Sequence, residues 1–415
     1  MSPRSFLFLQ GHATPFYLRL GQALDRAGHD VGRINICGGD RLFWGDWHAE
    51  DFRGPVPDLD AAVSDAARRH GASDLVVYND IRPCNAIAIA AAKRLGLRVH
   101  VFEEGYLRPD WITLERDGVN GNSRLPADPD WYRETARALP PASVAAPVGS
   151  GLRERIFYDF RWQAANYRHW LRYPRYRTHR PYPIWAEYAT WMTRLSVLHF
   201  RRARAKALIA DLVERNRRFF LFPLQLDTDS QIRQHSSYGR LSAAIDAVIE
   251  NFARSAPGSA WLIVKNHPLD NAWINYRRLV ERRARTLGVS ERVRFIDGGD
   301  LNLLLDRCAG VVTVNSTTGL TALQRGRPVI ALGKAVFRIP GLTSDAGLDA
   351  FWNDPRRPDP GLLSAFQRVL LETCLVNGNF YTEAGMPLAI ENSVVRLTAE
   401  TDLLSEAAPR ASAVA

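Results

Sequence analysis

Short apolar runs alternate with segments of helical spacing along two long parts of the chain. In the first part, apolar runs predict strands at 5–9, 31–37, 74–78 and 99–102, and helical spacing predicts helices at 17–27 and 86–92. The second part predicts strands at 219–226, 261–265, 293–296, 310–314 and 329–332, with helices at 241–252, 276–287, 303–308 and 319–324. Strands that alternate with helices indicate a parallel sheet in each part.

The alternation stops between the two parts. Residues 123–150 contain five prolines, and a basic, aromatic stretch with interrupted helical spacing follows them. We therefore predict an N-terminal Rossmann-like domain, a Pro-rich excursion with a basic aromatic connection, a C-terminal Rossmann-like domain, a helical segment and a frayed tail. Their respective boundaries are 1–122, 123–217, 218–345, 346–405 and 406–415.

Open α/β sheets bind their ligands at the carboxyl ends of the strands. The predicted fold class is therefore α/β, with two doubly wound domains facing a cleft, which is the architecture of GT-B glycosyltransferases. Since a fold alone does not assign a function, the residues at the strand ends must do so.

Composition places the protein among ordinary globular chains, since 46% of its 415 residues are hydrophobic and 24% are charged. No apolar run approaches the roughly 18 residues of a membrane span, which predicts a cytoplasmic protein. The four cysteines lack a CxxC spacing, which argues against a disulfide framework and against a zinc site.

The net charge of +10 comes from one segment. Residues 151–206 carry 13 Lys and Arg, 3 Asp and Glu, and 13 aromatic residues, whereas the rest of the chain carries 41 charges of each sign. This composition suits an anionic bilayer surface, with Arg172, Arg175, Arg177 and Arg180 as contributors, and it equally suits a solvated helical bridge between the domains. Because no recognition motif accompanies the charge, we expect no nucleic-acid partner.

Two motifs at strand ends of the second part suit an anion, although the chain has neither a G-x-G-x-x-G fingerprint nor a P-loop. One is a hydroxyl-rich turn that begins a helix, which by itself is explained as an ordinary N-cap. The other places a Lys and a His where they can meet the same anion, because His before Pro is held extended. The candidate binding residues are Lys265, His267, Pro268, Asn315, Ser316, Thr317, Thr318 and Gly319.

Carboxylates follow two other predicted strands. Glu103 and Glu104 end strand 99–102, where crowding or burial lets one of them retain a proton as a general acid; a charged turn is the alternative. Asp229 lies in an Asp-x-Asp motif after strand 219–226, between Gln225 and Ser236. Such a motif clamps a metal in sugar transferases of another fold, which this chain lacks, and a solvated loop is the remaining alternative.

Six motifs together resemble the KpsS/LipB-type capsule polysaccharide proteins. They occur in order between about residues 5 and 382, apart from the connection, as FLFLQGHATPFY, INICGGDRLFW, EEGYLRP, FPLQLDTDSQI, KNHPLD and VNSTTGLTALQRGRPVIALG. The resemblance implies a retaining β-Kdo transferase of GT-B-like fold that uses CMP-Kdo to start the poly-Kdo linker on a (lyso)phosphatidylglycerol acceptor. Such an enzyme would act peripherally at the inner face of the cytoplasmic membrane, beside capsule assembly and export proteins.

The resemblance also implies roles for residues. Asp229 is the expected nucleophile and Glu103 the acid/base, with Glu104 as a second candidate. Gln225 and Ser230 join the anion-binding residues around the donor, among which Lys265, His267, Ser316 and Thr317 would hold the CMP phosphate and the Kdo carboxylate. The acceptor-side candidates are Gln10, Gly11, His12, Glu104, Tyr106 and Arg108, together with Gly39 and Asp40 of a predicted Gly-Gly turn at 38–41.

Retention is explained by two successive inversions, which require one carboxylate nucleophile and a second group for the acceptor proton. We expect no cofactor and no obligatory metal, because CMP is a good leaving group whose charge the Lys, the His and the helix N-terminus can meet. The alternatives are a non-catalytic capsule export or binding scaffold and an inverting CMP-sugar transferase of sialyltransferase type. The carboxylates at Asp229 and Glu103 weigh against the scaffold.

Overall fold

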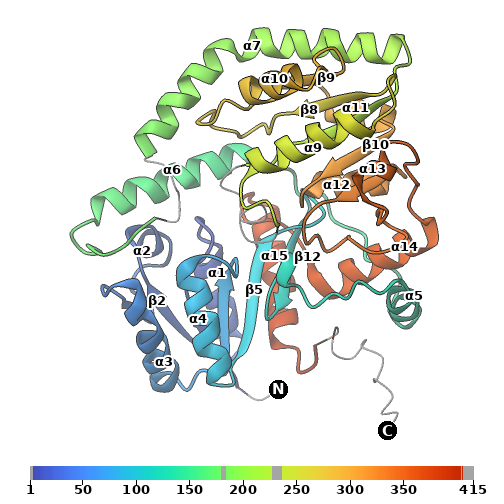
Figure 1. Ribbon diagram of the computed structural model, residues 1–415. Helices are drawn as coiled ribbons and strands as arrows, with labels where there is room; N and C mark the ends of the chain where they lie inside the picture. The colour runs from blue at the N-terminus through green and yellow to red at the C-terminus, as the bar shows by residue number, and fades with distance from the viewer. Residues whose placement is uncertain (1–2, 179–183, 227–235, 403, 405–415) are drawn as a thin grey trace. The chain divides into compact units, whose positions relative to one another are not determined.

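The computed structural model describes residues 3–178, 184–226, 236–402 and 404 (Figure 1). The chain divides into two compact units. Unit 1 comprises Met1–Pro126, Glu134–His179 and Gln367–Ala415, and unit 2 comprises Ala127–Arg133 and Arg180–Phe366. The predicted connection 123–217 and the predicted C-terminal segment 346–405 are therefore each divided between the two units.

Unit 1 is built on a sheet of seven strands in the order β12-β6-β5-β4-β1-β2-β3. Its strands are β1 (Ser5–Phe8), β2 (Asp30–Asn35), β3 (Ala49–Asp51), β4 (Asp74–Tyr78), β5 (Arg98–Glu104), β6 (Trp111–Arg116) and β12 (Leu375–Asn377). Its helices are α1 (Phe16–Arg26), α2 (Gly38–Trp44), α3 (Leu59–Arg69), α4 (Pro83–Arg94), α6 (Leu152–Arg168) and α15 (Gly385–Thr398), with the short turns η1 (Val56–Asp58), η2 (Asn120–Asn122) and η3 (Leu370–Cys374).

The sheet of unit 1 is mixed, whereas the sequence predicts a parallel one. Strands β1 to β5 pair in parallel, but β6 runs antiparallel to β5, and β12 runs antiparallel to β6. β6 follows β5 after the short connection 105–110, and an antiparallel pair needs no crossover helix to join it.

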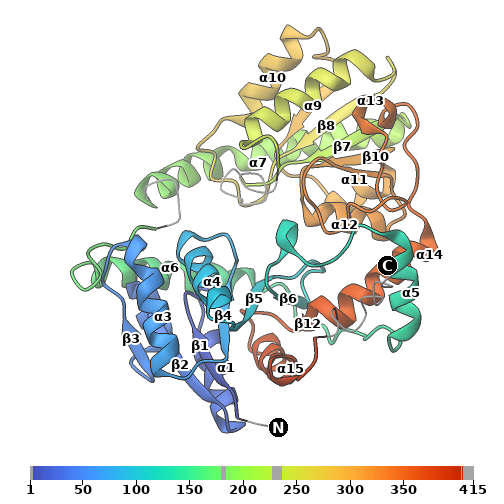
Figure 2. The ribbon, with the colours of Figure 1, turned by 60° about the horizontal axis from the view of Figure 1, so that its bottom comes forward.

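Helices cover both faces of this sheet. One core contains Phe6 and Phe8 of β1 together with apolar residues of α1 and α15, and the other contains Leu7 of β1 with residues of α3 and α4. All four residues of β1 are buried, and the three that follow Ser5 are apolar. Figure 2 shows α3 and α4 together on one side of the sheet.

Unit 2 holds a five-stranded sheet in the order β11-β10-β7-β8-β9, parallel throughout as predicted. Its strands are β7 (Phe219–Pro223), β8 (Trp261–Lys265), β9 (Val293–Ile296), β10 (Gly310–Thr313) and β11 (Val329–Ala331). Its helices are α7 (Ile184–Glu214), α9 (Leu241–Ser255), α10 (Tyr276–Thr286), α11 (Leu301–Arg307), α12 (Thr317–Gln324) and α13 (Gly347–Phe351).

The core on one face of this sheet joins the strands to α9, α10 and α13. Figure 2 shows α11 and α12 on the other side of the sheet from α9 and α10. Both units thus have helices on both faces of a mainly parallel sheet, which confirms the predicted class of two doubly wound α/β domains. Two further helices, α5 (Pro129–Ala138) and α14 (Pro360–Val369), cross the boundary between the units. None of the described helices is both long and apolar enough to cross a membrane.

Candidate active site

The carboxyl end of β5 in unit 1 presents two adjacent glutamates with different surroundings. Glu103 accepts hydrogen bonds from the Tyr78 hydroxyl (3.0 Å), the Asn79 side-chain amide (2.6 Å) and the backbone N–H of Glu104 (3.0 Å). Tyr78 and Asn79 stand at the end of the neighbouring strand β4, so the parallel pairing of β4 and β5 brings these groups together. Glu103 is therefore fixed in orientation while it remains partly accessible.

Glu104 points into a cluster of cationic and aromatic groups. Its carboxylate accepts the Tyr381 hydroxyl proton and lies 3.3 Å from the Arg155 guanidinium. The His12 Nε2 lies 3.0 Å from the Tyr381 hydroxyl oxygen and 3.9 Å from Glu104. Because the Tyr381 proton is donated to Glu104, His12 must donate its Nε2 proton to Tyr381, which fixes the ring tautomer.

The two glutamates have opposite pKa shifts. Burial raises the pKa of Glu103, the nearby Glu104 charge adds to this, and the three donors offset part of it. Burial also opposes ionisation of Glu104, but the charges of Arg108 and Arg155 outweigh it, and the pKa of Glu104 falls to about 2. Of the two carboxyl groups, Glu103 is therefore the one that holds its proton to the higher pH, whereas Glu104 stays ionised at neutral pH.

His12 is a neutral member of this cluster. Its ring stacks on Phe380 with centroids 4.8 Å apart and planes 9° apart, and it meets the edges of Tyr78 and Tyr381. Burial lowers its pKa to about 3, because the Glu104 charge does not compensate for the lost hydration. Its Nδ1 is shielded from solvent and has no hydrogen-bond partner among the described residues.

The loop that carries His12 is held by close packing. The Tyr17 ring lies where a side chain at Gly11 would stand, at 2.5–2.9 Å from a Cβ built there. Arg82 donates to the Gly11 carbonyl (3.1 Å), and Asn85 donates to the carbonyl of Gln10 (3.3 Å). Gln10 is itself buried, so this loop presents mainly the His12 ring.

Other predicted acceptor-side residues have partners inside the fold. Asp40 is buried and accepts from Arg33 (2.8 Å) and from the Ile36 N–H (3.1 Å), which supports the start of α2. The sequence predicts a turn at Gly38–Gly39, but α2 begins there. The Trp162 ring of α6 occupies the place of a side chain at Gly39, whose N–H donates to Asn166 (2.8 Å).

Tyr106 and Arg108 differ in their distance from the glutamate pair. The buried Tyr106 hydroxyl donates to Glu115 (2.6 Å) and accepts from the Asn120 N–H (2.7 Å), so it is engaged away from Glu103 and Glu104. Arg108 is exposed and donates to the Gly105 carbonyl (3.1 Å), and its charge acts on Glu104. The structure thus gathers His12 and Arg108 with the glutamates and gives Asp40, Gly39 and Tyr106 supporting contacts.

Sequence reasoning missed five groups of this cluster: Tyr78, Asn79, Arg155, Phe380 and Tyr381. Tyr78 and Asn79 end a strand that was predicted, so the strand-end rule that selected Glu103 would have found them. Arg155, Phe380 and Tyr381 come from α6 and from the segment after β12, which no local pattern places beside β5.

Three predicted segments of unit 2 meet at the ends of β7, β8 and β10. The Gln225 side-chain oxygen accepts the Asn315 N–H (2.9 Å), which ties the β7 end to the β10 end. Ser316 is the N-cap of α12, and its hydroxyl accepts the Thr318 N–H (3.2 Å). At Gly319 a side chain would meet the Phe337 ring at 2.7 Å, so the first turn of α12 packs against that ring.

The β8 end supplies a cation and a ring donor. Lys265 is buried, burial lowers its pKa, and no hydrogen bond joins its ammonium to another described residue. The His267 Nδ1 accepts the Leu269 N–H (3.1 Å), so the ring carries its proton on Nε2 as a donor. Together with the α12 N-terminus, these groups favour an anion.

Arg194 of α7 holds the loop that contains His267 and Pro268. Its guanidinium donates to the carbonyls of His267 (3.2 Å), Pro268 (2.9 Å) and Asp270, and it pairs with Asp297 at 2.7 Å. Arg194 and Asp297 are each 2% exposed. The sequence offered no signal for this role, because Arg194 is one of many arginines in its segment.

The predicted nucleophile Asp229, with Asp227 and Ser230, lies outside the described residues. Among the described residues, no group of three or more His, Cys, Asp and Glu side chains is arranged to hold a metal ion.

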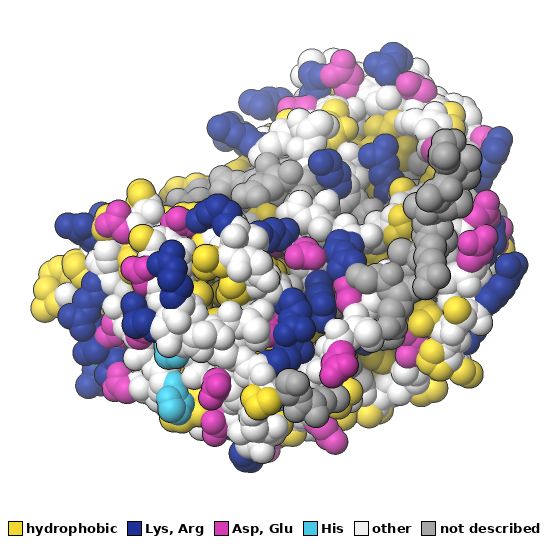
Figure 3. All heavy atoms as spheres, turned by 90° about the horizontal axis from the view of Figure 1, so that it is seen from below, with side chains coloured by type: hydrophobic (Ala, Val, Ile, Leu, Met, Phe, Trp, Pro, Cys, Tyr) yellow, Lys and Arg dark blue, Asp and Glu magenta, His cyan; other side chains and the backbone are white. Residues whose placement is uncertain are grey.

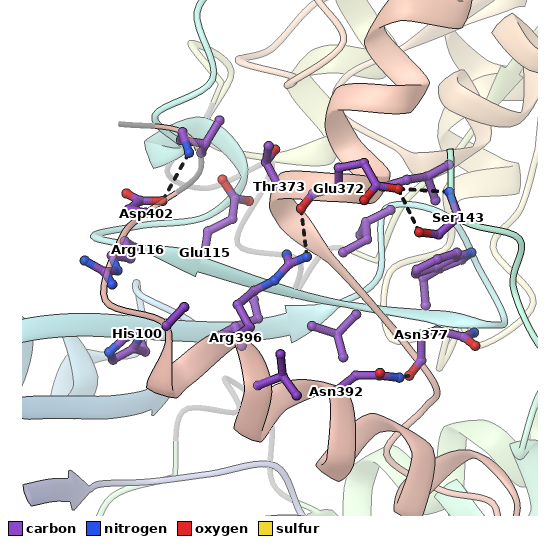
Figure 4. Close-up of a pocket in the computed structure, with 18 of the residues that line it drawn as sticks. His100, Glu115, Arg116, Ser143, Glu372, Thr373, Asn377, Asn392, Arg396 and Asp402 are labelled. Carbon is purple, nitrogen blue, oxygen red and sulfur yellow. Dashed lines mark hydrogen bonds between the residues drawn. The ribbon is translucent and has the colours of Figure 1, made fainter. Parts of the chain in front are cut away.

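A separate pocket of about 560 Å³ lies in unit 1 beside β6, β12 and α15 (Figure 4). Its polar groups bind one another in part: Glu372 accepts from Ser143 (2.7 Å), and Asn392 donates to the Asn377 carbonyl (3.2 Å). None of the predicted site residues lines it. The strand ends, not this pocket, therefore carry the candidate chemistry.

Comparisons with known sequences show the family of this chain. The family model for "Capsule polysaccharide biosynthesis protein" matches residues 73–381. The chain is 32% identical over 389 residues to the capsule polysaccharide export protein KpsS of Escherichia coli, covering 92% of this chain and 98% of that one. It is 32% identical over 394 residues to the capsule polysaccharide modification protein LipB of Neisseria meningitidis serogroup A, covering 93% and 94%. Among solved structures it is similar to the beta Kdo 2,7 transferase of Thermosulfurimonas dismutans KpsC, with 14% identity, 95% and 100% coverage and a TM-score of 0.44.

Proposed function

Because this chain belongs to the capsule polysaccharide biosynthesis family, as its motifs predicted, we propose that it is a retaining glycosyltransferase. In this proposal it transfers Kdo from CMP-Kdo to a (lyso)phosphatidylglycerol acceptor at the inner face of the cytoplasmic membrane and starts the poly-Kdo linker. It works there beside capsule assembly and export proteins. The observation that carries the proposal is the contrast between two adjacent carboxyl groups at the end of β5: Glu103 is held by the neutral donors Tyr78 and Asn79, whereas Glu104 faces the Arg155 guanidinium.

The proposal assigns the donor to unit 2. Lys265 and the Nε2 proton of His267 would meet the negative charges of CMP-Kdo, and the N–H groups and hydroxyls at the start of α12 would add further donors. The chain's own cations thus fill the role for which other sugar transferases use a metal ion. We therefore expect the transfer to need no divalent metal.

The proposal assigns the acceptor proton to unit 1. A raised pKa makes the Glu103 carboxylate more basic than an ordinary glutamate, which suits a group that takes the acceptor hydroxyl proton. Glu104, with its pKa near 2, cannot exchange a proton at neutral pH. In this assignment it orients Tyr381 and Arg155 beside the acceptor.

Two inversions at one carbon give net retention. First, the Asp229 carboxylate attacks the anomeric carbon, the bond to the phosphate oxygen breaks, and CMP leaves with the electron pair. Next, the acceptor oxygen attacks the same carbon while its proton passes to Glu103, and the bond to Asp229 breaks. The proton on Glu103 then returns to water, which restores the starting state.

Mass spectrometry of products and of the intact protein tests these assignments. Freshly generated CMP-Kdo and a lysophosphatidylglycerol analogue are incubated with the wild type, Asp229→Asn, Glu103→Gln and the matched control Glu104→Gln. We expect Kdo-lipid from the wild type, reduced product from Glu104→Gln, and none from the other two. Glu103→Gln should accumulate protein with the added mass of one Kdo, because its first step is intact and its second step lacks a base.

Other outcomes would overturn specific parts. CMP-Kdo binding without product in any acceptor mixture would indicate a non-catalytic scaffold. A product with inverted anomeric configuration by NMR would reject double displacement and favour a sialyltransferase-type mechanism. If Glu103→Gln and Glu104→Gln lost the same share of product and neither accumulated the Kdo adduct, the division of roles between the two glutamates would be rejected.

A further inference from the structure

Helix α6 leaves one of its faces uncovered by the described residues. Ile156, Phe157, Phe160 and Tyr167 recur at helical spacing along this face, and Trp170 and Leu171 continue it just past the helix end. These six side chains, here called the α6 stripe, are between 57% and 74% exposed. Large apolar side chains so exposed and so regularly placed mark an interaction surface.

Arginines border the α6 stripe. Arg153, Arg161, Arg168 and Arg175 are exposed, and none of them forms an ion pair with another described residue. The Arg161 guanidinium lies 5.7 Å from the Phe157 ring centroid, so charge and aromatic surface are adjacent. At the left edge of Figure 3, where α6 ends, hydrophobic side chains protrude among Lys and Arg. A face that combines Phe, Trp and Tyr with unpaired arginines is complementary to an anionic lipid headgroup layer.

The opposite face of α6 is tied to the candidate active site. Trp162 and Ala165 pack against the glycines that begin α2, and Arg155 pairs with Glu104. The helix therefore has a fixed orientation in unit 1. Since an α-helix with its side chains is about 10–12 Å across, the end of the α6 stripe at Ile156 and Phe157 lies roughly one helix diameter from the Glu104 carboxylate that Arg155 contacts.

We propose that the α6 stripe is a membrane-docking surface that lies among the headgroups of an anionic bilayer. Its purpose rests on the proposed function, because docking by this face would hold the Glu103–Glu104 pair at the depth of a lipid acceptor's headgroup. The surface differs from the one that composition predicted. Arg172 is paired with Asp51 at 2.5 Å, and Arg180 lies outside the described residues.

Vesicle co-sedimentation without any donor sugar tests this surface. The variant Phe157→Glu/Phe160→Glu changes two exposed side chains of the α6 stripe that contact neither glutamate. Its matched control is Val144→Glu/Val395→Glu, which places the same charges at two apolar positions of unit 1 that are more exposed still, at 94% and 69%. Vesicles of phosphatidylcholine mixed with phosphatidylglycerol are compared with vesicles of phosphatidylcholine alone.

We expect the wild type and the control to bind the mixed vesicles and the α6 variant to bind at least about tenfold more weakly, since two aromatic side chains no longer enter the interface. Binding to pure phosphatidylcholine should be weaker for all proteins, and added salt should weaken binding to the mixed vesicles. Equal binding by the α6 variant and the control would overturn the proposal. The proposal would also be overturned if the wild type bound neither kind of vesicle, or if it formed a dimer through this face instead.

This experiment separates the docking surface from the enzymatic proposal. Vesicle binding requires no CMP-Kdo. A protein that does not bind vesicles can therefore still be tested for transfer to a water-soluble, short-chain acceptor. Conversely, an inactive protein that binds vesicles through the α6 stripe would overturn the transferase assignment and support the surface. If both proposals hold, the α6 variant keeps its rate on the soluble acceptor and loses about tenfold on the vesicle-embedded one.

Discussion

Replacing Arg194 with Leu removes the group that joins α7 to the donor-binding loop of unit 2. The guanidinium makes two contacts with the Asp297 carboxylate and donates to the carbonyls of His267, Pro268 and Asp270. Leucine fills part of the volume but offers no donor. The variant therefore leaves a buried carboxylate with Arg201, 3.3 Å away, as its remaining cationic partner in the described part of the chain.

The expected loss of stability follows from this environment. Removing one partner of a buried ion pair costs about 3–5 kcal/mol, and the partly exposed Arg201 places this case toward about 3 kcal/mol. For a unit of this size, 1 kcal/mol shifts Tm by about 2–4 °C, so we expect unit 2 to melt roughly 6–12 °C lower. Arg194→Lys keeps the charge but loses the planar set of donors, so its effect should be intermediate.

Urea unfolding followed by circular dichroism measures the loss, with hydrogen exchange of the β8 and β9 amides to assign the transition to unit 2. Arg204→Leu, on the exposed side of the same helix, is the matched control. CMP affinity is measured on the folded variants. We expect it to fall about tenfold for Arg194→Leu and to be unchanged for Arg204→Leu, because the first alters the loop that carries His267.

The dependence of the loss on pH gives an independent check. Burial opposes ionisation of Asp297, but Arg194 and Arg201 outweigh it and hold its pKa below the ordinary value. A depressed carboxyl pKa stabilises the fold above the unfolded pKa near 3.9, and this contribution disappears as pH falls through the folded pKa. The difference in unfolding free energy between the wild type and Arg194→Leu should therefore be constant above about pH 5 and become smaller below about pH 4. A deficit below 1 kcal/mol at neutral pH, equal to that of Arg204→Leu, would refute the reasoning.

Three further predictions concern the glutamate cluster and the donor chemistry. The folded His12 has a pKa of about 3, so between pH 6.5 and 3 only the unfolded chain binds a proton at this residue, and acidification destabilises the wild type. His12→Gln lacks this effect, so the difference in unfolding free energy between wild type and variant should shrink by up to about 1.4 kcal/mol per pH unit on acidification. Urea unfolding at pH 7, 5.5 and 4.5 measures this difference. Glu103 must be ionised to act as a base, so kcat/KM should fall with decreasing pH on a limb above the ordinary glutamate pKa, and Glu103→Gln should lower kcat by about 10²–10⁴-fold. Chelator treatment should leave the transfer rate unchanged, and added Mg²⁺ or Mn²⁺ should not raise it.

Each of these has a contrary result. A His12→Gln deficit that is the same at all three pH values would mean that His12 has the same pKa in the folded and unfolded chain. A pH profile with its acidic limb near pH 2 would assign the base to Glu104. Loss of activity with a chelator and recovery with a divalent cation would transfer the phosphate role from Lys265 and His267 to a metal ion.

The local pattern of the chain sufficed to predict most strands and helices. β1 and β4 are buried along their whole lengths, so each appears as an apolar run after its first residue, Ser5 or Asp74, and α9 carries a regular apolar stripe. In contrast, β12 has three residues and joins β6, whose sequence lies about 260 positions earlier. Such a short strand has no period of its own, so neither its existence nor the return of the chain to unit 1 could be predicted.

The candidate site divides in the same way. Glu103, Lys265 and Ser316 were found because each lies at or just after the end of a predicted strand, and the carboxyl ends of parallel strands lie along one edge of their sheet; Asn79 has the same kind of position and was overlooked. Arg194 and Tyr381 were not found, because they come from elements whose position depends on packing across the whole unit.

The sequence by itself therefore determined the chemical groups at the strand ends and the family, because these depend on residues adjacent in the chain. Only the tertiary structure decided that the pKa values of the two adjacent glutamates shift in opposite directions. That difference depends on burial and on the charge of Arg155, which α6 brings beside Glu104 from about 50 residues further along the chain. Electrostatic energies depend on distances in space and on exclusion of water, and neither quantity is set by spacing along a sequence.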